Sequence, residues 1–516
     1  MLGLRLMAKK GLDAYDNMRV LIYATSMKGC QEGSALEEAL YHLDKGDEVY
    51  YLHCGHTMRG CFDNPTFNKA ICKECQFFLH KRTLHYLPKE CVHTVDEFYD
   101  EEVKREVEAF KAPDDAEAVR ALVYRGVDVG YGALSTYISL TRNLNPKMEG
   151  EVKRYFESMI KQEIALTLIG EKVVELFKPD LIVFHNGRFA QYKPFLNIAR
   201  NSKIDFIATE TNLLRDGRAS INNFFNTIPH DPNAYLERME IAWNKCADTK
   251  NREEIGRSFF ENRRYGKYSG DKIYVKNQTY GKLPEQWEDV KEHIVIFNSS
   301  EDEYAAIDKT VDALALFKNQ LEGIKAIMSR YGKDDRKQFV LRIHPNLTGI
   351  PFDYHTDLYK LNYRNLIVVA PESDISSYAL LDAADKVIVF GSTIGIESAY
   401  WHKPVICLAH SFYLKLDVAY NPKSQEELWK LIETNNLPDK YKEDVLKFGY
   451  FFMSNNRKGF KYVENGVNYY KLFSHDYGYP RYCKLAGSTY LYMLVNGGLR
   501  AMLRKYGKEE FKNVPI

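Results

Sequence analysis

Short apolar runs alternate with helical patterns through the second half of the chain, and this alternation limits the possible folds more than any other feature. Runs this short and apolar are typical of parallel strands that helices cover on both faces. The apolar runs lie at 293–297, 339–344, 366–369, 386–390 and 404–408. The helical patterns lie at 304–331, 376–384 and 393–401. This half of the chain is therefore expected to form an α/β domain on a parallel sheet.

The first half of the chain has a similar order of elements. Apolar runs typical of strands lie at 18–26, 48–53, 180–185 and 205–208. Helical patterns lie at 34–43, 150–177 and 190–201. This strand–helix–strand order again indicates a parallel sheet. A chain of 516 residues exceeds what one hydrophobic core usually supports, so we expect two α/β domains.

The polar stretch 229–287 lacks long apolar runs, and we interpret it as an excursion followed by an interdomain linker. The first domain is then expected at 1–285 and the second at 286–435. The remaining stretch, 436–516, is rich in aromatic residues and is expected to be helical. By analogy with other two-domain proteins, we expect this tail to cross back to the first domain. Two such domains in tandem also favour a ligand-binding cleft between them.

Composition and charge exclude several classes of protein. The net charge of +1 argues against a nucleic-acid partner, because nucleic-acid-binding domains usually carry a basic excess. No segment reaches the roughly 18 consecutive apolar residues of a membrane-spanning helix. The stretch 1–10 has basic residues but no apolar core before a cleavage site, so it does not resemble a secretory signal. We therefore expect a cytoplasmic protein.

The sequence Arg-Ile-His-Pro-Asn ends one of the predicted strands. Arg342 and His344 alternate there with apolar residues, and Pro345 stops the strand. In open α/β sheets, ligands bind at the carboxyl ends of the strands. Side chains of these types donate hydrogen bonds to phosphate oxygens. We expect Arg342, His344 and Asn346 to contact a ligand, although His344 taken alone also fits a structural histidine.

A second turn of small residues, Gly391 to Glu397, joins another predicted strand to a helix. A helix N-terminus offers unpaired N–H groups and the positive end of a dipole, which suits a phosphate. Gly391, Ser392 and Thr393 let the backbone come close to such a group. A capping box needs a glutamate three residues after the capping side chain, and Glu397 lies four after Thr393. We therefore expect the carboxylate of Glu397 to accept hydrogen bonds from a pair of ribose hydroxyls.

A third strand-to-helix turn carries Ser299 and Ser300 at the start of the second domain. If the sheet is parallel, this turn lies at the same edge as the other two. A serine at a helix start is usually a cap, and Glu303 completes a capping box with Ser300. The two serines are therefore candidates for donor binding and, as the alternative, for capping.

Together these stretches resemble bacterial surface-polysaccharide glycosyltransferases of the capsule-synthesis type. The resemblance covers about 290–430 well and is weaker in the first domain. It implies the GT-B fold, in which two Rossmann-like domains face a cleft, and an enzyme that is inverting and needs no metal for catalysis. It also implies that His344, Ser392, Thr393 and Glu397 contact the donor nucleotide. His402 stands where the family usually has a glycine before Lys-Pro.

The resemblance implies a nucleotide-sugar donor, linked to CMP, UDP or GDP, and a growing surface polysaccharide or lipid-linked glycan as acceptor. Sugar-nucleotide 2-epimerases and glycerol-phosphate-type transferases resemble the same motifs. The match therefore identifies donor binding better than it identifies the reaction, and these activities remain alternatives.

Inverting glycosyl transfer needs a base near the acceptor hydroxyl. We expect it at strand ends of the first domain, where Glu210 is the first candidate and His185 an alternative. An ion pair of Glu210 with Arg188 or Arg215 is the competing interpretation. A third candidate is Asp231, which follows a proline and a histidine. On the acceptor side, Asn186, Gly187 and Arg188 form the loop after one strand; Gly187 serves the turn, and Arg188 is expected to position a phosphate or carboxylate.

Four cysteines lie within a short stretch: Cys54, Cys61, Cys72 and Cys75. The last two form a C-x2-C pair, and four thiolates are able to hold a structural zinc ion tetrahedrally. Reduced structural thiols, an iron–sulfur cluster and disulfides remain alternatives. A closed set of four ligands does not suit a catalytic metal, so we expect no cofactor in catalysis.

The segment 485–508 alternates apolar residues with basic ones. A basic amphipathic segment is able to lie on an anionic membrane surface, which would place the protein peripherally at the inner face of the cell membrane. A packing helix with a solvated face is the alternative. Membrane contact would suit a lipid-linked acceptor.

Overall fold

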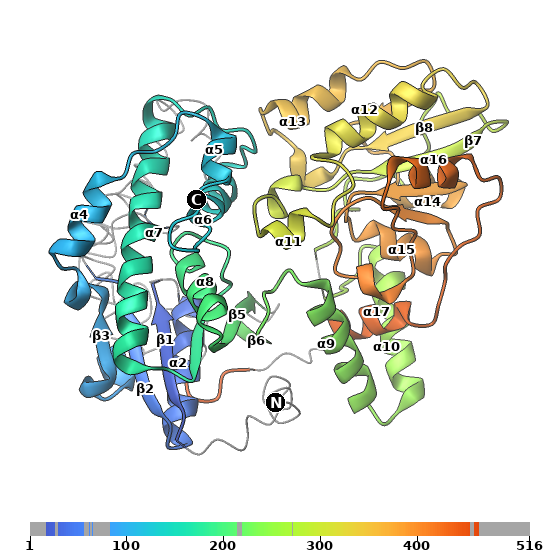
Figure 1. The fold of residues 1–516 in the computed structure, drawn as a ribbon. Coiled ribbons are helices and arrows are strands. Elements are labelled where there is room, and N and C mark those ends of the chain that lie inside the picture. Colours follow the sequence, from blue (N-terminus) through green and yellow to red (C-terminus); the bar gives the residue numbers. More distant parts are fainter. Residues whose placement is uncertain are drawn as a thin grey trace, which may run out of the picture. The chain divides into compact units, whose positions relative to one another are not determined.

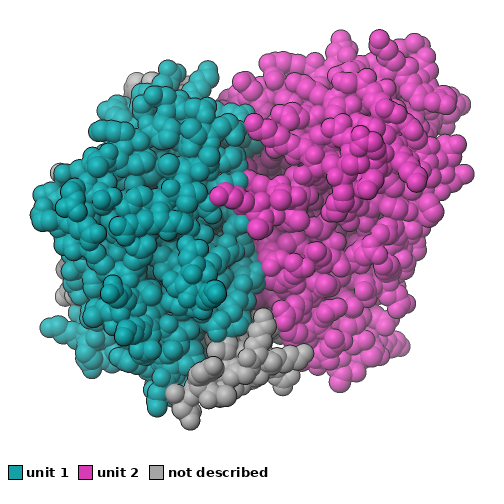
Figure 2. All heavy atoms as spheres, viewed as in Figure 1, with its two compact units in different colours: residues 1–229, 306–308, 457–516 teal, residues 230–305, 309–456 magenta. Residues whose placement is uncertain are grey.

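The computed structural model describes residues 17–25, 29–55, 61, 64, 83–213, 219–270, 272–454 and 459–463. These residues form two compact units. Unit 1 contains the described residues up to 229 together with 306–308 and 459–463, and unit 2 contains 230–305 and the described residues from 309 to 454. Figure 2 colours the atoms of the two units.

Unit 1 is built on a six-stranded sheet with the order β3-β2-β1-β4-β5-β6. The strands are β1 (Arg19–Ala24), β2 (Glu48–His53), β3 (Val92–Thr94), β4 (Leu181–His185), β5 (Asp205–Leu213) and β6 (Ala219–Phe225). Every pairing is parallel except that of β6, which runs antiparallel to β5. The strands expected in the first half of the chain are therefore confirmed, and the sheet is parallel as expected.

Helices cover both faces of this sheet (Figure 1). The helices of unit 1 are α2 (Gly29–Asp44), α4 (Glu101–Ala109), α5 (Ala116–Arg120), α6 (Val129–Thr141), α7 (Gly150–Phe177) and α8 (Lys193–Ser202). On one face, Leu36 of α2 packs in the same core as Ile22 and Val183 of the strands. On the other face, Tyr23 of β1 stacks on Phe195 of α8 with 3.9 Å between ring centroids. Successive strand residues point to opposite faces, so β1 contributes to both cores.

Unit 2 is built on a five-stranded sheet with the order β11-β10-β7-β8-β9, and all its pairings are parallel. The strands are β7 (Glu292–Phe297), β8 (Lys337–Arg342), β9 (Leu366–Val369), β10 (Lys386–Val389) and β11 (Val405–Cys407). The helices are α9 (Pro232–Lys245), α10 (Thr249–Arg264), α11 (Lys309–Asp312), α12 (Gln320–Tyr331), α13 (Asp353–Thr356), α14 (Ser377–Ala383), α15 (Ile394–Tyr400), α16 (Gln425–Glu433) and α17 (Val445–Met453). The expected fold class, two α/β units on largely parallel sheets, is confirmed. The expected cleft stays a prediction.

The single helix expected at 304–331 is wrong. The chain there forms a 3-10 turn at Glu301–Glu303, then the short α11, and only then α12. Ala306 has a φ of +56°, which interrupts a right-handed helix, and 306–308 belong to unit 1. Asn319 then begins α12 as its N-cap and accepts a hydrogen bond from the N–H of Glu322.

The domain boundary expected near residue 285 also differs from the structure. Helices α9 and α10 lie in unit 2, because an aromatic cluster joins them to α17. Phe259 of α10 meets Phe448 of α17 edge-on, with 5.5 Å between ring centroids. The stretch 436–453, expected as a separate tail, is thus part of the core of unit 2. The polar composition of 229–287 concealed this apolar face.

The chain then returns to unit 1 through residues 459–463. The buried carboxylate of Glu37, on α2, accepts hydrogen bonds from the N–H groups of Lys461 (2.6 Å), Tyr462 (2.8 Å) and Val463 (3.0 Å). These five residues are the part of the expected return crossing that the structure describes. The basic amphipathic segment 485–508 lies outside the described residues. Within the described residues, no helix has the length and apolar character needed to cross a membrane.

Candidate functional site

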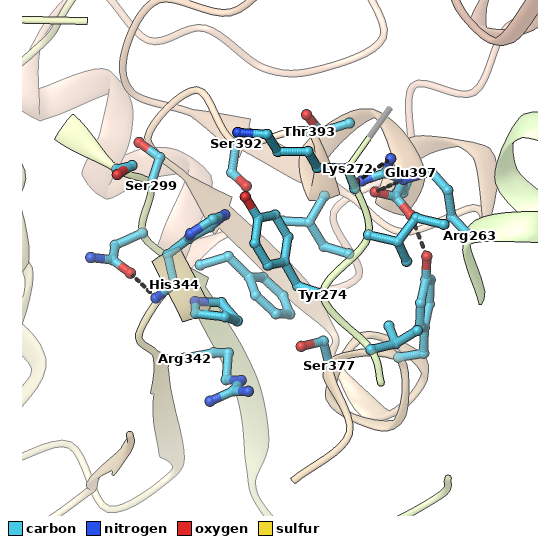
Figure 3. A pocket seen from close by; sticks show the side chains of 18 of the residues that line it. Arg263, Lys272, Tyr274, Ser299, Arg342, His344, Ser377, Ser392, Thr393 and Glu397 are labelled. Carbon is cyan, nitrogen blue, oxygen red and sulfur yellow. Dashed lines mark hydrogen bonds and ion pairs between the residues drawn. The ribbon is translucent and has the colours of Figure 1, made fainter. Parts of the chain in front are cut away.

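A pocket of about 270 Å³ opens in unit 2 at the carboxyl ends of β7, β8 and β10 (Figure 3). It brings together residues of all three strand-end turns expected from the sequence. These are Ser299 and Ser300 after β7, Arg342 and His344 at the end of β8, and Ser392, Thr393 and Glu397 after β10. Asn346 does not line the pocket but hydrogen-bonds to residues that do, as described below. Their contact with a donor stays a prediction, but their convergence on one pocket agrees with it.

The turn after β10 has the compact backbone that its small residues suggest. Gly391 has a φ of +88°, and a Cβ on it would lie 2.0 Å from the carbonyl oxygen of His410. The carbonyl of Ser392 accepts a hydrogen bond of 2.8 Å from the hydroxyl of Tyr413. Thr393 precedes α15 without capping it through its side chain. The turn is therefore fixed by its neighbours, and the first N–H groups of α15 have no acceptors within the helix.

Glu397 is buried in the wall of the pocket, and each of its carboxylate oxygens has a partner. Oε1 accepts a hydrogen bond of 2.9 Å from Nε of Arg263, and Oε2 accepts one from the hydroxyl of Tyr378. Burial, and then the charge of Glu397, raises the pKa of Tyr378 far above its usual value. The phenol therefore stays protonated and donates. A carboxylate oxygen accepts more than one hydrogen bond, so these partners are compatible with the expected ribose contact.

Arg263 ties this carboxylate to a loop that the sequence analysis placed in a linker. Its Nη1 donates to the carbonyl of Lys272 (3.0 Å) and to the hydroxyl of Ser269 (3.4 Å). Lys272 and Tyr274 line the pocket. The interpretation of this stretch as an interdomain linker is therefore wrong. Sequence reasoning missed these residues because none lies at a strand end: Arg263 is in the last turn of the polar helix α10, and Lys272 and Tyr274 lie in the loop after it.

Arg342 is buried but does not point to the centre of the pocket. It donates to the carbonyls of Ala370 and of Ser373 (3.3 Å), in the loop that leads from β9 to α14. Figure 3 shows its guanidinium directed away from Ser392 and Thr393. Burial lowers the pKa of Arg342 to about 10, so it remains charged at neutral pH. The geometry favours a support for this loop over the expected phosphate contact, which stays a prediction.

His344, in contrast, extends into the pocket. Its N–H donates to Oδ1 of Asn298 (2.8 Å), and its Nδ1 accepts from the N–H of Asn346 (3.1 Å). Because Nδ1 is an acceptor, the proton of the neutral ring is on Nε2. The ring meets that of Tyr274 edge-on, with 5.0 Å between centroids. His344 thus presents a donor edge, which suits a phosphate oxygen.

The two serines after β7 have structural partners. Ser299 donates through its hydroxyl to the carbonyl of Phe390 (2.8 Å), which joins β7 to the turn after β10. Ser300 donates to Asp302 (2.8 Å) and gives no side-chain cap. The expected capping box of Ser300 with Glu303 is therefore wrong. Glu303 instead accepts a hydrogen bond of 3.2 Å from Nδ2 of Asn346, which also donates to the hydroxyl of Ser300 (3.0 Å).

In unit 1, the candidates for the acceptor side gather at the ends of β4 and β5. Nδ2 of Asn186 donates to Oε2 of Glu210, and Nε2 of His185 lies 4.0 Å from Oε1 of the same carboxylate. Asn186 and Gly187 have φ values of +54° and +84°, so this turn needs left-handed backbone, as expected for Gly187. Arg188 donates to the hydroxyl of Ser139. The structure thus groups Glu210 with His185 and Asn186.

The third candidate base has a structural explanation. Asp231 is the N-cap of α9, and its Oδ1 accepts a hydrogen bond of 2.9 Å from the N–H of Asn233. It also lies in unit 2, not with Glu210 and His185. The geometry therefore favours the first two candidates.

The family described as "Capsule polysaccharide biosynthesis protein" matches residues 182–442 of the chain. The chain belongs to this family. The match begins in β4, so it includes Glu210 as well as the whole pocket of unit 2. The resemblance stated from the sequence motifs is thereby confirmed.

This member of the capsule polysaccharide biosynthesis family also has distant likenesses among solved structures. One is the beta Kdo 2,4 transferase KpsC of Thermosulfurimonas dismutans, with 14% identity, a TM-score of 0.33, and cover of 52% of this chain and 78% of that chain. Another is the UDP-GlcNAc 2-epimerase of Methanocaldococcus jannaschii, with 13% identity, a TM-score of 0.23, and cover of 84% and 98%. TM-scores this low support no conclusion about fold or activity. None of the curated proteins matches the chain.

The cysteine cluster of this family member lies before the matched region. Cys54 and Cys61 are half-buried, while Cys72 and Cys75 lie outside the described residues. Among the residues that the structure describes, no three His, Cys, Asp or Glu side chains are arranged to hold a metal ion. The structural zinc stays a prediction.

Proposed function

We propose that the protein is a glycosyltransferase that moves a sugar from a nucleotide-sugar donor to a growing surface polysaccharide or a lipid-linked glycan. Membership of a capsule polysaccharide biosynthesis family supports this proposal. The single observation that carries it is the pocket of unit 2, where His344, the Ser392–Thr393 turn and Glu397 converge at the carboxyl edge of a parallel sheet. Ligands of open α/β sheets bind at this edge.

Each pocket residue suits one part of a nucleotide. The N–H groups that begin α15 and the Nε2–H of His344 are donors for phosphate oxygens. Glu397 is the acceptor for ribose hydroxyls, and Arg263 and Tyr378 hold its carboxylate in place. Donors at the phosphate stabilise the charge that develops on the leaving nucleotide.

The transfer itself is proposed to be inverting and independent of metal. The acceptor oxygen attacks the anomeric carbon, the bond from that carbon to the phosphate oxygen breaks, and a base takes the hydroxyl proton. Glu210 is the proposed base, with His185 as the alternative. Asn186 donates to Glu210 and would fix the direction of its carboxylate.

The proposal is tested first by ligand binding. Thermal shift with CMP, UDP, GDP and their sugars should reveal one nucleotide that stabilises the protein, because a ligand that binds the folded state raises its stability. His344→Ala and Glu397→Gln should each weaken binding of that nucleotide about tenfold or more, since each removes a hydrogen bond to a charged or buried group. His402→Ala, on an exposed turn outside the pocket, is the matched control. Unchanged binding in both pocket variants would contradict the donor site.

The reaction is tested with the nucleotide sugar that binds. A transferase should release the nucleotide only when a glycan acceptor is present. Interconversion of the free nucleotide sugar without an acceptor would identify an epimerase instead. Glu210→Gln should lower kcat about a hundredfold or more while leaving nucleotide affinity unchanged, because loss of a general base slows only the chemical step. A fully active Glu210→Gln protein would refute this choice of base.

A further inference from the structure

The basic side chains that line the pocket differ in what they are able to offer a ligand. Arg263 is buried and donates to Glu397 and to a carbonyl oxygen. Arg342 is buried and donates to two carbonyl oxygens of the loop after β9. Lys272 also lines the pocket, but its side chain is exposed. Lys272 is thus an exposed basic residue in the lining of the pocket.

The loop that carries Lys272 is held at its first end by α10 and α17. Nη1 of Arg263 donates to the carbonyl of Lys272 itself (3.0 Å). Gly270 has a φ of +74°, and a Cβ on it would lie 2.2 Å from the carbonyl oxygen of Phe452. Asn262 also donates to the carbonyl of Tyr268 (2.9 Å). The backbone of the loop at Lys272 is therefore held against α10 and α17.

The loop is also held at its second end, beside α14. Oε1 of Gln278 accepts a hydrogen bond of 2.7 Å from the N–H of Ser377. The N–H of Thr279 donates to the carbonyl of Asp374 (2.8 Å). Between these attachments the loop forms one wall of the pocket through Lys272 to Val275. The loop is thus held at both ends by contacts within unit 2 and forms part of the pocket wall.

The side chain of Lys272 is directed toward the turn after β10. In Figure 3 its side chain extends across the pocket toward the side where Ser392 lies. Ser392 and Thr393 line the same pocket as Lys272, as does His344, whose Nε2–H suits a phosphate oxygen. An ammonium group is a point charge that pairs well with phosphate oxygens.

We propose that Lys272 binds the phosphate of the donor nucleotide, opposite the Ser392–Thr393 turn, on a loop that Arg263 holds in position. The inference rests on the proposed function, because it assumes a nucleotide in this pocket. It gives Lys272 the role of cationic phosphate contact that the sequence motif alone would give to Arg342.

Isothermal titration calorimetry tests this assignment on the full chain with the nucleotide found by thermal shift and with its nucleoside. Lys272→Met should weaken nucleotide binding about tenfold or more and leave nucleoside binding unchanged, because only the nucleotide carries the phosphate. Its nucleotide affinity should also depend less on salt than that of the wild type. Lys272→Arg should keep most of the affinity. Lys276→Met, an exposed lysine of the same loop outside the pocket, is the matched control and should change neither affinity.

The outcomes separate the two proposals. A Lys272→Met protein that binds nucleotide as the wild type does would overturn the role of Lys272 and leave the proposed function standing. Equal losses for nucleotide and nucleoside would overturn it as well, because they would show a general change in the pocket. A wild-type chain that binds none of the nucleotides or nucleotide sugars would overturn the proposed function itself.

Discussion

At the scale of single residues, burial changes the pKa of one carboxyl group beside the pocket, that of Glu301. Glu301 directly follows Ser300, and its carboxylate accepts a hydrogen bond of 3.2 Å from the N–H of Gln320 at the start of α12. Burial raises the pKa of Glu301 to about 7. The pKa of Glu301 thus differs between the folded protein and the unfolded chain.

This difference predicts how stability depends on pH. The folded protein keeps the proton of Glu301 up to about pH 7, whereas the unfolded chain loses it near its usual pKa of 4.5. Stability from this group is therefore fully present below pH 4.5 and lost as the pH rises toward 7. Glu301→Gln should remove this loss. The free energy of unfolding of the variant, relative to that of the wild type, should therefore rise by about 3 kcal/mol between pH 4.5 and pH 8.

Urea unfolding of the wild type and the variant at pH 4.5 and pH 8 measures this gain. Glu285→Gln, which changes an exposed carboxyl group, is the control and should show no such difference between the two pH values. An equal effect of Glu301→Gln at both pH values would show that its carboxyl group titrates normally in the folded protein.

At the scale of elements, the turn after β10 shows how close packing fixes a binding loop. Gly391 and Gly281 have φ values of +88° and +74°, yet only Gly391 has a backbone atom where a Cβ would lie. Gly391→Ala should therefore cost the left-handed strain plus a clash with the carbonyl of His410, on the order of 3 kcal/mol or more. Gly281→Ala should cost only the strain, about 1 kcal/mol. Thermal unfolding compares the two, and equal losses would disprove the close approach.

The same scale shows what the sequence was able to predict. Apolar runs bounded by turns predicted the strands of unit 2, and the strand ends of a parallel sheet then placed His344 near Ser392 and Glu397. The loop carrying Lys272 was missed, because its position depends on the contact of Arg263 with Glu397, which is 134 residues away in the sequence. The break before α12 was missed because helical periodicity continues through 304–319.

At the scale of the whole molecule, the chain contributes to each unit in more than one piece. Unit 1 includes the described residues up to 229, then 306–308, then 459–463. Within it, Asp308 pairs with Arg200 of α8 at 2.9 Å, and Nζ of Lys193 donates to the carbonyl of Ile307 (2.8 Å). Glu37 holds the third piece through three N–H groups. Specific polar contacts therefore fasten each returning segment.

The contact of Glu37 predicts a local change on mutation. Glu37→Gln replaces one carboxylate oxygen by an NH2 group that cannot accept, so at least one of the three N–H groups loses its acceptor and the others keep only a neutral one. Amide hydrogen exchange of Lys461, Tyr462 and Val463 should become about tenfold faster or more. Glu48→Gln, an exposed change in the same unit, should leave exchange unaltered. Unchanged protection in Glu37→Gln would show that other contacts hold the segment.

The Glu37 contact also affects when unit 1 acquires all its described parts during synthesis. Lys461 follows Glu37 by 424 residues, so the ribosome makes almost the whole described chain before this carboxylate meets its donors. Unit 2, by contrast, needs nothing beyond residue 454 among its described residues. Domains fold largely as units during synthesis, in order from the N-terminus. Unit 1, whose synthesis begins first, therefore acquires its last described segment only after the described residues of unit 2 have been made.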